Sequence, residues 1–352
     1  MNLDDLSTLT QIDSHNMLAE IDGLPDQLET AWQTGQTFPL PELTGIRQVL
    51  IAGMGGSAIG ADLLAAYAAP LCRVPIFIQR NYGLPAWAHG EHTLVIASSH
   101  SGNTEETLEA FHEAGQRGCL RIAISTGGTL AEAARAQNVP LWQFPHKGQP
   151  RAAVGFSFGL LLAVFSRLNL LPNPENDLRT ALSALRAQQT HLRADVPTVN
   201  NPAKRMAGQL YGRWVAVFSS DVLEPVARRW KGQISELAKT WAQFEALPEA
   251  DHNTLAGVHY PPEGLMHTFT LFLRAPSYHP RNRLRANLTK KIFMLEALNT
   301  DFYDAPGETR LAHLWTALHF GDYMAYYLAI AYGVDPTPVE AIEMLKVELK
   351  KA

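Results

Sequence analysis

The chain has 352 residues, of which 46% are hydrophobic and 18% are charged, and its formal net charge is −5. This length predicts about two domains of roughly 150 residues each, with enough apolar material for a sizeable core. The basic residues are scattered and form no cationic tract. An extended surface for nucleic acid or for an anionic membrane is therefore not expected, although one local pocket can still bind a small anion.

Cysteine content and the N-terminal stretch indicate the compartment. Cys72 and Cys119 are too few for a disulfide framework and lack metal-ligand spacing, which favours a reducing environment. The stretch MNLDDLSTLTQIDSHN is acidic and polar, unlike a secretory signal. The longest largely apolar run, GFSFGLLLAVF, has eleven residues and is too short to cross a bilayer. We expect a soluble, cytoplasmic protein.

The first half of the chain alternates between strand-like and helix-like segments, as in a parallel sheet covered by helices. Residues 47–69 predict a strand, a glycine-rich turn and a helix, and residues 92–118 and 120–137 repeat that order. Residues 74–81 and 139–145 predict two further strands. The runs VLIAG, LVIAS and RIAIS are apolar almost throughout, as expected of strands buried on both faces.

The middle of the chain predicts a domain boundary. A long apolar helix over Phe156–Leu170 is followed by LLPNPEND, which is rich in Pro and Asn, and then by a linking helix over residues 175–200. Weaker alternation resumes after Asn201. It predicts strands over 213–221 and 266–276 and helices over 224–244, 285–299 and 313–333.

These patterns predict an α/β protein with two doubly wound parallel sheets. The first domain is expected over residues 1–170, a linking helix over 171–200 and the second domain over 201–352. FSSD follows the first strand of the second domain, where ASSHSG ends a strand of the first, a faint trace of duplication.

The turn GMGGSAIG, residues 53–60, matches the G-x-G-x-x-A form of a dinucleotide-binding turn. That reading needs an acidic residue at the end of the next strand, and the chain has Gln79, Arg80 and Asn81 there. An NADP site could use Arg80, but the pattern argues against a nicotinamide cofactor. The alternative is that the backbone at Gly56 and the Ser57 hydroxyl approach a phosphate at a helix N-terminus.

The turn SSHSGNTEET, residues 98–107, follows a buried strand with hydroxyl side chains from Ser99, Ser101 and Thr104. In open α/β sheets, ligands bind beyond the carboxyl ends of the strands, where a helix dipole favours an anion. Asn103 and Glu106 have capping-box spacing, so part of this polarity could belong to ordinary helix initiation. Together with GMGGS, the turn predicts a site for a monophosphate.

Four further residues have both an ordinary and a functional interpretation. Arg151 precedes the apolar helix and is either a surface arginine or a cation that stabilises developing negative charge. Glu236 lies about 80° from the apolar stripe of its helix, at about 100° per residue, and can be a solvated glutamate or a base. His252 lies in a polar loop, and Lys346 lies on an amphipathic tail; most such residues are merely exposed.

Taken together, these stretches resemble the bifunctional phosphoglucose/phosphomannose isomerase family, which is built from two sugar-isomerase (SIS) domains of flavodoxin-like fold. The matching segments are GMGGSAIG, SSHSGNTEET, PRAAVG, RWKGQISELAK, PEADHNTLAG and a lysine near the C-terminus, in that order. GMGGS and SxSGNT mark SIS domains in general. The spacing of Glu236 and His252, with HN after a PE element, narrows the resemblance to this isomerase family.

The resemblance implies an enzyme that interconverts glucose 6-phosphate, and also mannose 6-phosphate, with fructose 6-phosphate through a cis-enediol. Glu236 would move the proton between C2 and C1, and Arg151 would stabilise the enediolate. His252 would assist ring opening, with Lys346 nearby. The residues that would bind the sugar phosphate are Gly56, Ser57, Ser99, Ser101 and Thr104. The family works without a metal or another cofactor, as homodimers whose site includes the partner's histidine.

The chain departs from the family pattern at His100, where we would expect an aromatic residue such as tyrosine, and at Ser235 and Leu237, where asparagines are frequent. These departures bear on the rate of the reaction and on the preference among substrates more than on the type of reaction. The compact Thr337 and Val339 would leave room for the C1–C2 unit to rotate if their segment lines the pocket, and otherwise merely begin the last helix. Two rivals stay open: a non-catalytic sugar-phosphate-binding SIS protein and an aminosugar-phosphate isomerase or deaminase.

Overall fold

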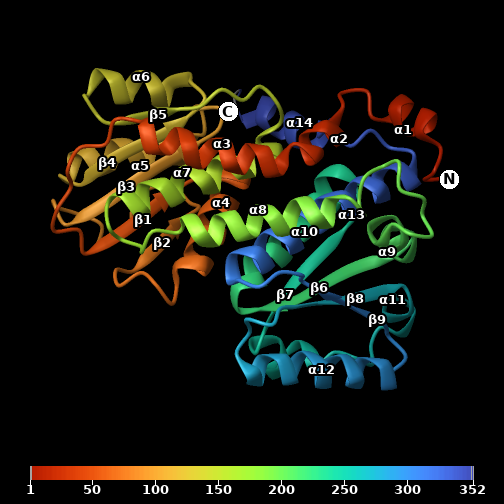
Figure 1. Cartoon of the computed structure of the whole chain (residues 1–352). Coiled ribbons are helices and arrows are strands. Elements are labelled where there is room, and N and C mark those ends of the chain that lie inside the picture. Colours follow the sequence, from red (N-terminus) through yellow and green to blue (C-terminus); the bar gives the residue numbers. More distant parts are fainter. Residues whose placement is uncertain (1, 350, 352) are drawn as a thin grey trace. The chain divides into compact units, whose positions relative to one another are not determined.

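A computed structural model describes residues 2–349 and 351 of the chain (Figure 1). The chain forms two compact units, which we call the N-terminal and the C-terminal unit. The N-terminal unit contains Gly23–Leu185 and Gly307–Leu314. The C-terminal unit contains Met1–Asp22, Arg186–Pro306 and Trp315–Ala352. The predicted division into 1–170, 171–200 and 201–352 stays a prediction.

The N-terminal unit is built on a parallel sheet with the strand order β2-β1-β3-β4-β5. Strand β3 is the central strand and is buried along its whole length, which explains why its sequence does not alternate. All five strands were predicted, and so was the parallel sheet. Their bounds are Gln48–Ala52 (β1), Ile76–Gln79 (β2), Thr93–Ser99 (β3), Leu120–Ser125 (β4) and Leu141–Gln143 (β5).

The central helix of this unit, α7 (Val154–Arg167), is buried from Val154 to Phe165. Helix α3 (Leu24–Thr37) packs closely against it because α7 has glycine at two contact points. A Cβ on Gly159 would come within 2.6 Å of Ala31 Cβ, so no larger residue fits there. Three further helices each follow a strand of this sheet in the sequence: α4 (Gly55–Ala68) after β1, α5 (Glu105–Gln116) after β3 and α6 (Gly128–Ala136) after β4. Helix α8 (Glu175–Gln189) follows α7, and the division between the two units falls within it, after Leu185.

The C-terminal unit contains a second parallel sheet, with the strand order β7-β6-β8-β9. The strands are β6 (Trp214–Ser220), β7 (Ala242–Leu247), β8 (Thr268–Arg274) and β9 (Asn299–Asp304). Two parallel-sheet α/β domains were predicted, and this second sheet confirms that prediction. The helices are α1 (Leu6–Ile12), α2 (Met17–Asp22), α9 (Pro202–Leu210), α10 (Glu224–Leu237), α11 (Pro262–Met266), α12 (Pro280–Leu295), α14 (Glu340–Leu349) and most of α13 (Arg310–Tyr332).

Two predicted helices end earlier than expected. The helix predicted over 224–244 is wrong in its second half, because α10 ends at Leu237 and β7 begins at Ala242. Lys239 has φ +56°, a left-handed conformation that ends a helix, and Trp241 beyond it is exposed. The linking helix was expected over 175–200, but α8 ends at Gln189.

Within residues 2–349, every helix is too short or too polar to cross a lipid bilayer.

Candidate active site

The first polar turn joins β1 to α4 and lies beside the second. Gly53 lies so close to β3 that a Cβ there would be 2.9 Å from the Ser98 carbonyl oxygen. Ser57, in the first turn of α4, is 4% exposed, and its Oγ accepts a hydrogen bond of 3.2 Å from the His100 backbone N–H. Two turns about forty residues apart in the sequence therefore meet at the carboxyl end of the sheet.

The second polar turn joins β3 to α5 and is folded around Ser99. Ser99 Oγ lies 2.9 Å from Thr104 Oγ1 and accepts the Gly102 backbone N–H at 3.1 Å. Gly102 has φ +69°, and a Cβ on it would come within 2.8 Å of Ser125 Oγ, so the turn requires glycine. Ser99 is buried, Thr104 is half-buried and Ser101 is exposed. The hydroxyls of Ser99, Thr104 and Ser101 thus lie at the N-terminus of α5 and are increasingly exposed in that order.

The capping-box interpretation of Asn103 and Glu106 is wrong. Thr104 is the N-cap residue, because α5 begins at Glu105. The Asn103 side chain instead reaches the next helix, where its Oδ1 accepts hydrogen bonds from the backbone N–H and the hydroxyl of Thr129, both at 3.0 Å. Asn103 therefore fixes the turn to the start of α6 rather than initiating α5.

Arg151 is a buried cation next to the first turn. It lies on a short 3-10 segment, Pro150–Ala153, and is 5% exposed, so the interpretation as a surface arginine is wrong. Gly56 packs against this segment: a Cβ there would be 3.3 Å from Arg151 Cα and would clash with the Pro150 carbonyl oxygen. The N-terminal unit thus brings Gly56, Ser57, Ser99, Ser101, Thr104 and Arg151 together in one region.

His146 also lies in this region and was missed by sequence reasoning. Its Nδ1 is 2.8 Å from His100 Nε2, and the two rings meet edge to face. Phe144 and Phe156 stack beside them, with ring centroids 4.9 Å apart. The sequence did carry a signal, since His146 follows the last strand of the sheet, and the carboxyl ends of parallel strands lie together.

Glu236 lies in the last turn of α10 and is half-buried. The helix is fixed by a buried ion pair, in which Arg229 Nε and Nη2 donate to the two carboxylate oxygens of Asp322 at 3.0 and 2.7 Å. Trp230 Nε1 also donates to the Ala317 carbonyl at 2.9 Å. A rigid helix therefore carries the Glu236 side chain.

His252 and Lys346 lie on two other elements of the C-terminal unit, and both are exposed. His252 ends a 3-10 turn, Glu249–His252, whose Asp251 is held by Arg285 Nη1 at 2.8 Å and by Thr289 Oγ1 at 2.7 Å, both from α12. Lys346 lies on α14. Glu236, His252 and Lys346 thus come from three separate elements.

Two compact residues precede α14. Thr337 is buried, and its backbone N–H donates to Asp335 Oδ1 at 2.8 Å; Val339 is half-buried.

Among the described residues, no three His, Cys, Asp or Glu side chains converge closely enough to hold a metal ion.

Comparison with known proteins relates the whole chain to sugar-phosphate enzymes. The family model for the bacterial phospho-glucose isomerase C-terminal SIS domain matches residues 199–349. The bifunctional phosphoglucose/phosphomannose isomerase of Caldicellulosiruptor bescii is 36% identical over 337 residues, 95% of this chain and 98% of the relative. The enzyme of the same name from Aquifex aeolicus is 32% identical over 311 residues, 88% of this chain and 92% of the relative.

A solved structure shares the fold. The glucose-6-phosphate isomerase like protein from Thermus thermophilus superimposes with a TM-score of 0.64, covering 96% of this chain and 98% of its own. The two sequences are 22% identical. This likeness shows the two-sheet architecture alone.

Proposed function

The chain belongs to the bifunctional phosphoglucose/phosphomannose isomerase family, and we propose that it interconverts glucose 6-phosphate and mannose 6-phosphate with fructose 6-phosphate. One observation of the structure supports this most strongly. Two hydroxyl-bearing turns and the buried Arg151 meet at the carboxyl end of one sheet. Such a region can hold a phosphate at helix N-termini with a cation close by.

The phosphate would be held by the backbone near Gly56 and by the hydroxyls of Ser57, Ser99, Ser101 and Thr104. The phosphate that they would bind is on C6 of the sugar, remote from the reacting carbons C1 and C2. Their contribution is therefore to orient the substrate, so that binding energy from a remote group lowers the barrier at C1 and C2.

The reaction moves one proton. Glu236, as carboxylate, takes the proton from C2 of the open-chain aldose and returns it to C1 of the cis-enediol, while the O1 and O2 protons are rearranged to leave the ketose. Arg151 stabilises the negative charge of the enediolate. His252, with Lys346 nearby, transfers the proton that opens the sugar ring. Aldose and ketose have the same oxidation level overall, so the chemistry calls for no redox cofactor.

Both aldose phosphates differ only in configuration at C2 and share the same enediol. A single base serves both if the C1–C2 unit can rotate before the proton is removed. The compact side chains of Thr337 and Val339 would leave space for that rotation.

We also propose a cytoplasmic homodimer in which the partner's histidine completes each site. We retain domains over 1–170 and 201–352 as part of this proposal.

A coupled assay tests the function. Fructose 6-phosphate should give glucose 6-phosphate, detected with a dehydrogenase, and mannose 6-phosphate should give the same signal through fructose 6-phosphate. Each aldose phosphate should inhibit turnover of the other by competition. Glucosamine 6-phosphate should not react. Tight binding of fructose 6-phosphate without turnover would instead identify a sensor, and release of ammonia from glucosamine 6-phosphate would identify a deaminase.

A further inference from the structure

His100 lies between the hydroxyls of the second polar turn, and its backbone is held by three hydrogen bonds. Its N–H donates to Ser57 Oγ at 3.2 Å. Its carbonyl oxygen accepts the backbone N–H of Thr126 at 3.1 Å and the Thr126 hydroxyl at 2.7 Å. These bonds come from the start of α4 and from the residue after β4. The backbone at His100 is therefore fixed by contacts that do not involve the imidazole.

The segment that leads from β5 to Arg151, residues 144–149, is less well supported. Its first residue is fixed, because the Phe144 backbone N–H donates to the Ser125 carbonyl oxygen at 3.2 Å. The residues that follow belong to no helix or strand, and Lys147 among them is exposed. A side-chain contact in the middle of such a segment has a large influence on its path, and thereby on the place of Arg151.

His146 makes such a contact. Its Nδ1 lies 2.8 Å from His100 Nε2, so one ring donates an N–H and the other accepts it. Phe144 and Phe156 flank the two imidazoles, each with its ring centroid 6.0 Å from one of them. Both histidines are half-buried, and a hydrogen bond that is partly shielded from water is stronger than an exposed one. The bond ties the middle of the segment to the second polar turn.

We propose that His100 and His146 are positioning residues for Arg151. Their hydrogen bond holds the segment 144–149 against a turn that is already fixed, and so it sets the place of the guanidinium relative to the bound phosphate. Loss of the bond should loosen the segment and leave the phosphate site intact. This inference rests on the proposed function, in which Arg151 stabilises the enediolate. It also gives a role to His100, where the family pattern leads us to expect an aromatic residue such as tyrosine.

Substitutions that remove or keep the bond test this role. His100→Leu and His146→Leu each remove it. The double variant His100→Gln/His146→Asn should keep it without an imidazole, because the glutamine Nε2 and the asparagine Oδ1 take places similar to those of the ring nitrogens that they replace. His112→Leu is the control, since His112 is an exposed histidine on α5. Circular dichroism verifies that each variant is folded.

Each leucine variant should lower kcat at least about tenfold, because displacing a group that acts in the transition state by about 1 Å can cost ~10²-fold. KM for fructose 6-phosphate should stay close to the wild-type value. The fall in kcat should be equal for both aldose phosphates, since they share one enediolate. The Gln/Asn double variant should regain most of the lost kcat, and the control should match wild type.

Two kinetic outcomes would overturn the proposal. A raised KM with an unchanged kcat in the leucine variants would mean that the histidines contact the phosphate itself. A Gln/Asn double variant as slow as the leucine variants would mean that the reaction needs an imidazole, as in proton transfer, rather than the hydrogen bond.

Hydrogen–deuterium exchange measures the segment without turnover. Backbone exchange over residues 144–149 should be faster in both leucine variants than in wild type, and it should be close to wild type in the Gln/Asn double variant. Exchange over the second polar turn, residues 98–107, should not change. Equal exchange over 144–149 in all variants would overturn the proposal. A wild-type protein that fails the isomerase assay but shows the expected exchange would refute the proposed function and leave the link between turn and segment standing.

Discussion

The hydroxyl turn gives the most direct test at the scale of single residues. In Ser101→Ala/Thr104→Ala, KM for fructose 6-phosphate should rise at least tenfold, since each hydrogen bond to a charged group is worth about 1.5–3 kcal/mol. Steady-state kinetics measure this effect. The control is Thr107→Val one turn along α5, whose buried hydroxyl makes no hydrogen bond to the described residues. If KM is unchanged in both the double variant and the control, the phosphate binds at another place in the protein.

Residue types and spacing were enough to predict which side chains gather at the N-terminal sheet. The hydroxyls of Ser99 and Thr104 follow a strand, and strand ends in a parallel sheet converge. The burial of Arg151 could not be predicted, because it follows from the close approach of Gly56 to residue 150. Nor could the interaction of Asn103 with Thr129, since both residues also have ordinary local roles.

At the scale of elements, the packing of α4 on the Pro150–Ala153 segment should control Arg151. In Gly56→Ala, the new methyl would clash with the Pro150 carbonyl and press on Arg151 Cα. We expect kcat to fall more than KM rises, because the displaced cation serves the enediolate rather than the bound substrate. Gly208→Ala is the control, because a Cβ there meets no atom within 4 Å. An unchanged kcat in Gly56→Ala would contradict the role of Arg151 in the reaction.

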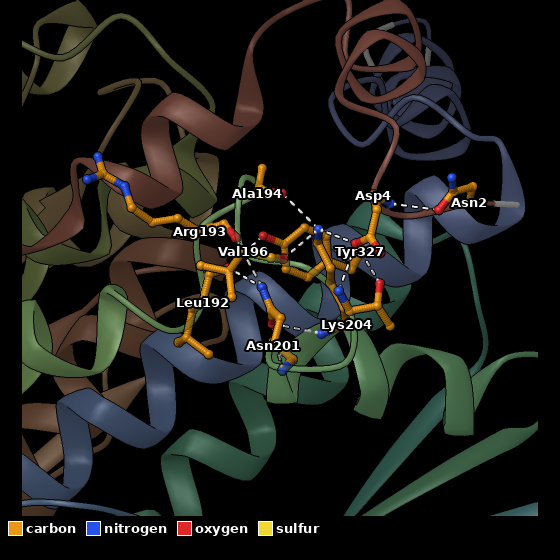
Figure 2. Close-up of polar contacts among 11 residues, drawn as sticks. Asn2, Asp4, Leu192, Arg193, Ala194, Val196, Asn201, Lys204 and Tyr327 are labelled. Carbon is orange, nitrogen blue, oxygen red and sulfur yellow. Dashed lines mark hydrogen bonds and ion pairs between the residues drawn. The ribbon is translucent and has the colours of Figure 1, made fainter.

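A second element-scale feature fastens the N-terminal segment to the rest of the C-terminal unit. Figure 2 shows the buried Lys204 of α9 surrounded by oxygen acceptors. Its Nζ donates to Asp4 Oδ1 at 3.0 Å and to the carbonyl oxygens of Ala194 and Val196 at 2.8 and 2.9 Å. The Tyr327 ring lies 5.5 Å from the same ammonium. One side chain thus joins segments 200 residues apart in the sequence.

Lys204→Met should lower the free energy of unfolding by about 1–3 kcal/mol, because the carbonyl oxygens of Ala194 and Val196 lose their donor, whereas Asp4 is exposed and remains solvated. Urea denaturation at pH 7 measures this, with the exposed neighbour Arg205→Met as control. Hydrogen bonds from Thr198 and Lys204 lower the pKa of Asp4 below its ordinary 3.8. The stabilisation from Asp4 is therefore complete above pH 3.8 and is lost as the pH falls through the lowered pKa. Equal stability of Lys204→Met and wild type at pH 7 would contradict this account.

Elements with an uninterrupted apolar or periodic pattern were predicted well, as in β3 and the first part of α10. Strand β7 was missed because AQFEAL continues the apolar spacing of α10, and only the left-handed conformation of Lys239 separates the two. Strand β9, NTDFYD, lies at the edge of its sheet and pairs with one strand only, so it carries polar residues. It was missed because this polar sequence lacks the apolar pattern that predicts a strand.

At the scale of the whole molecule, the shared site predicts complementation between inactive chains. Glu236→Gln and His252→Ala should each be inactive alone. After mixing and refolding in equal amounts, half of the dimers are hybrids and each hybrid has one intact site, so about a quarter of wild-type activity should return. Affinity tags of two kinds isolate the hybrids. Hybrids without activity would put His252 in the site of its own subunit.

The central claim is that one base moves a proton at C2 for two aldose phosphates, and proton NMR in deuterium oxide tests it most directly. Fructose 6-phosphate incubated with the wild-type protein should give both glucose 6-phosphate and mannose 6-phosphate, with deuterium at C2 in the fraction of turnovers in which the carboxyl proton exchanges with solvent before it is returned. Glu236→Gln, but not the exposed control Glu224→Gln on the same helix, should slow both exchanges by at least ~10²-fold. Exchange and interconversion at an undiminished rate in Glu236→Gln would contradict the account.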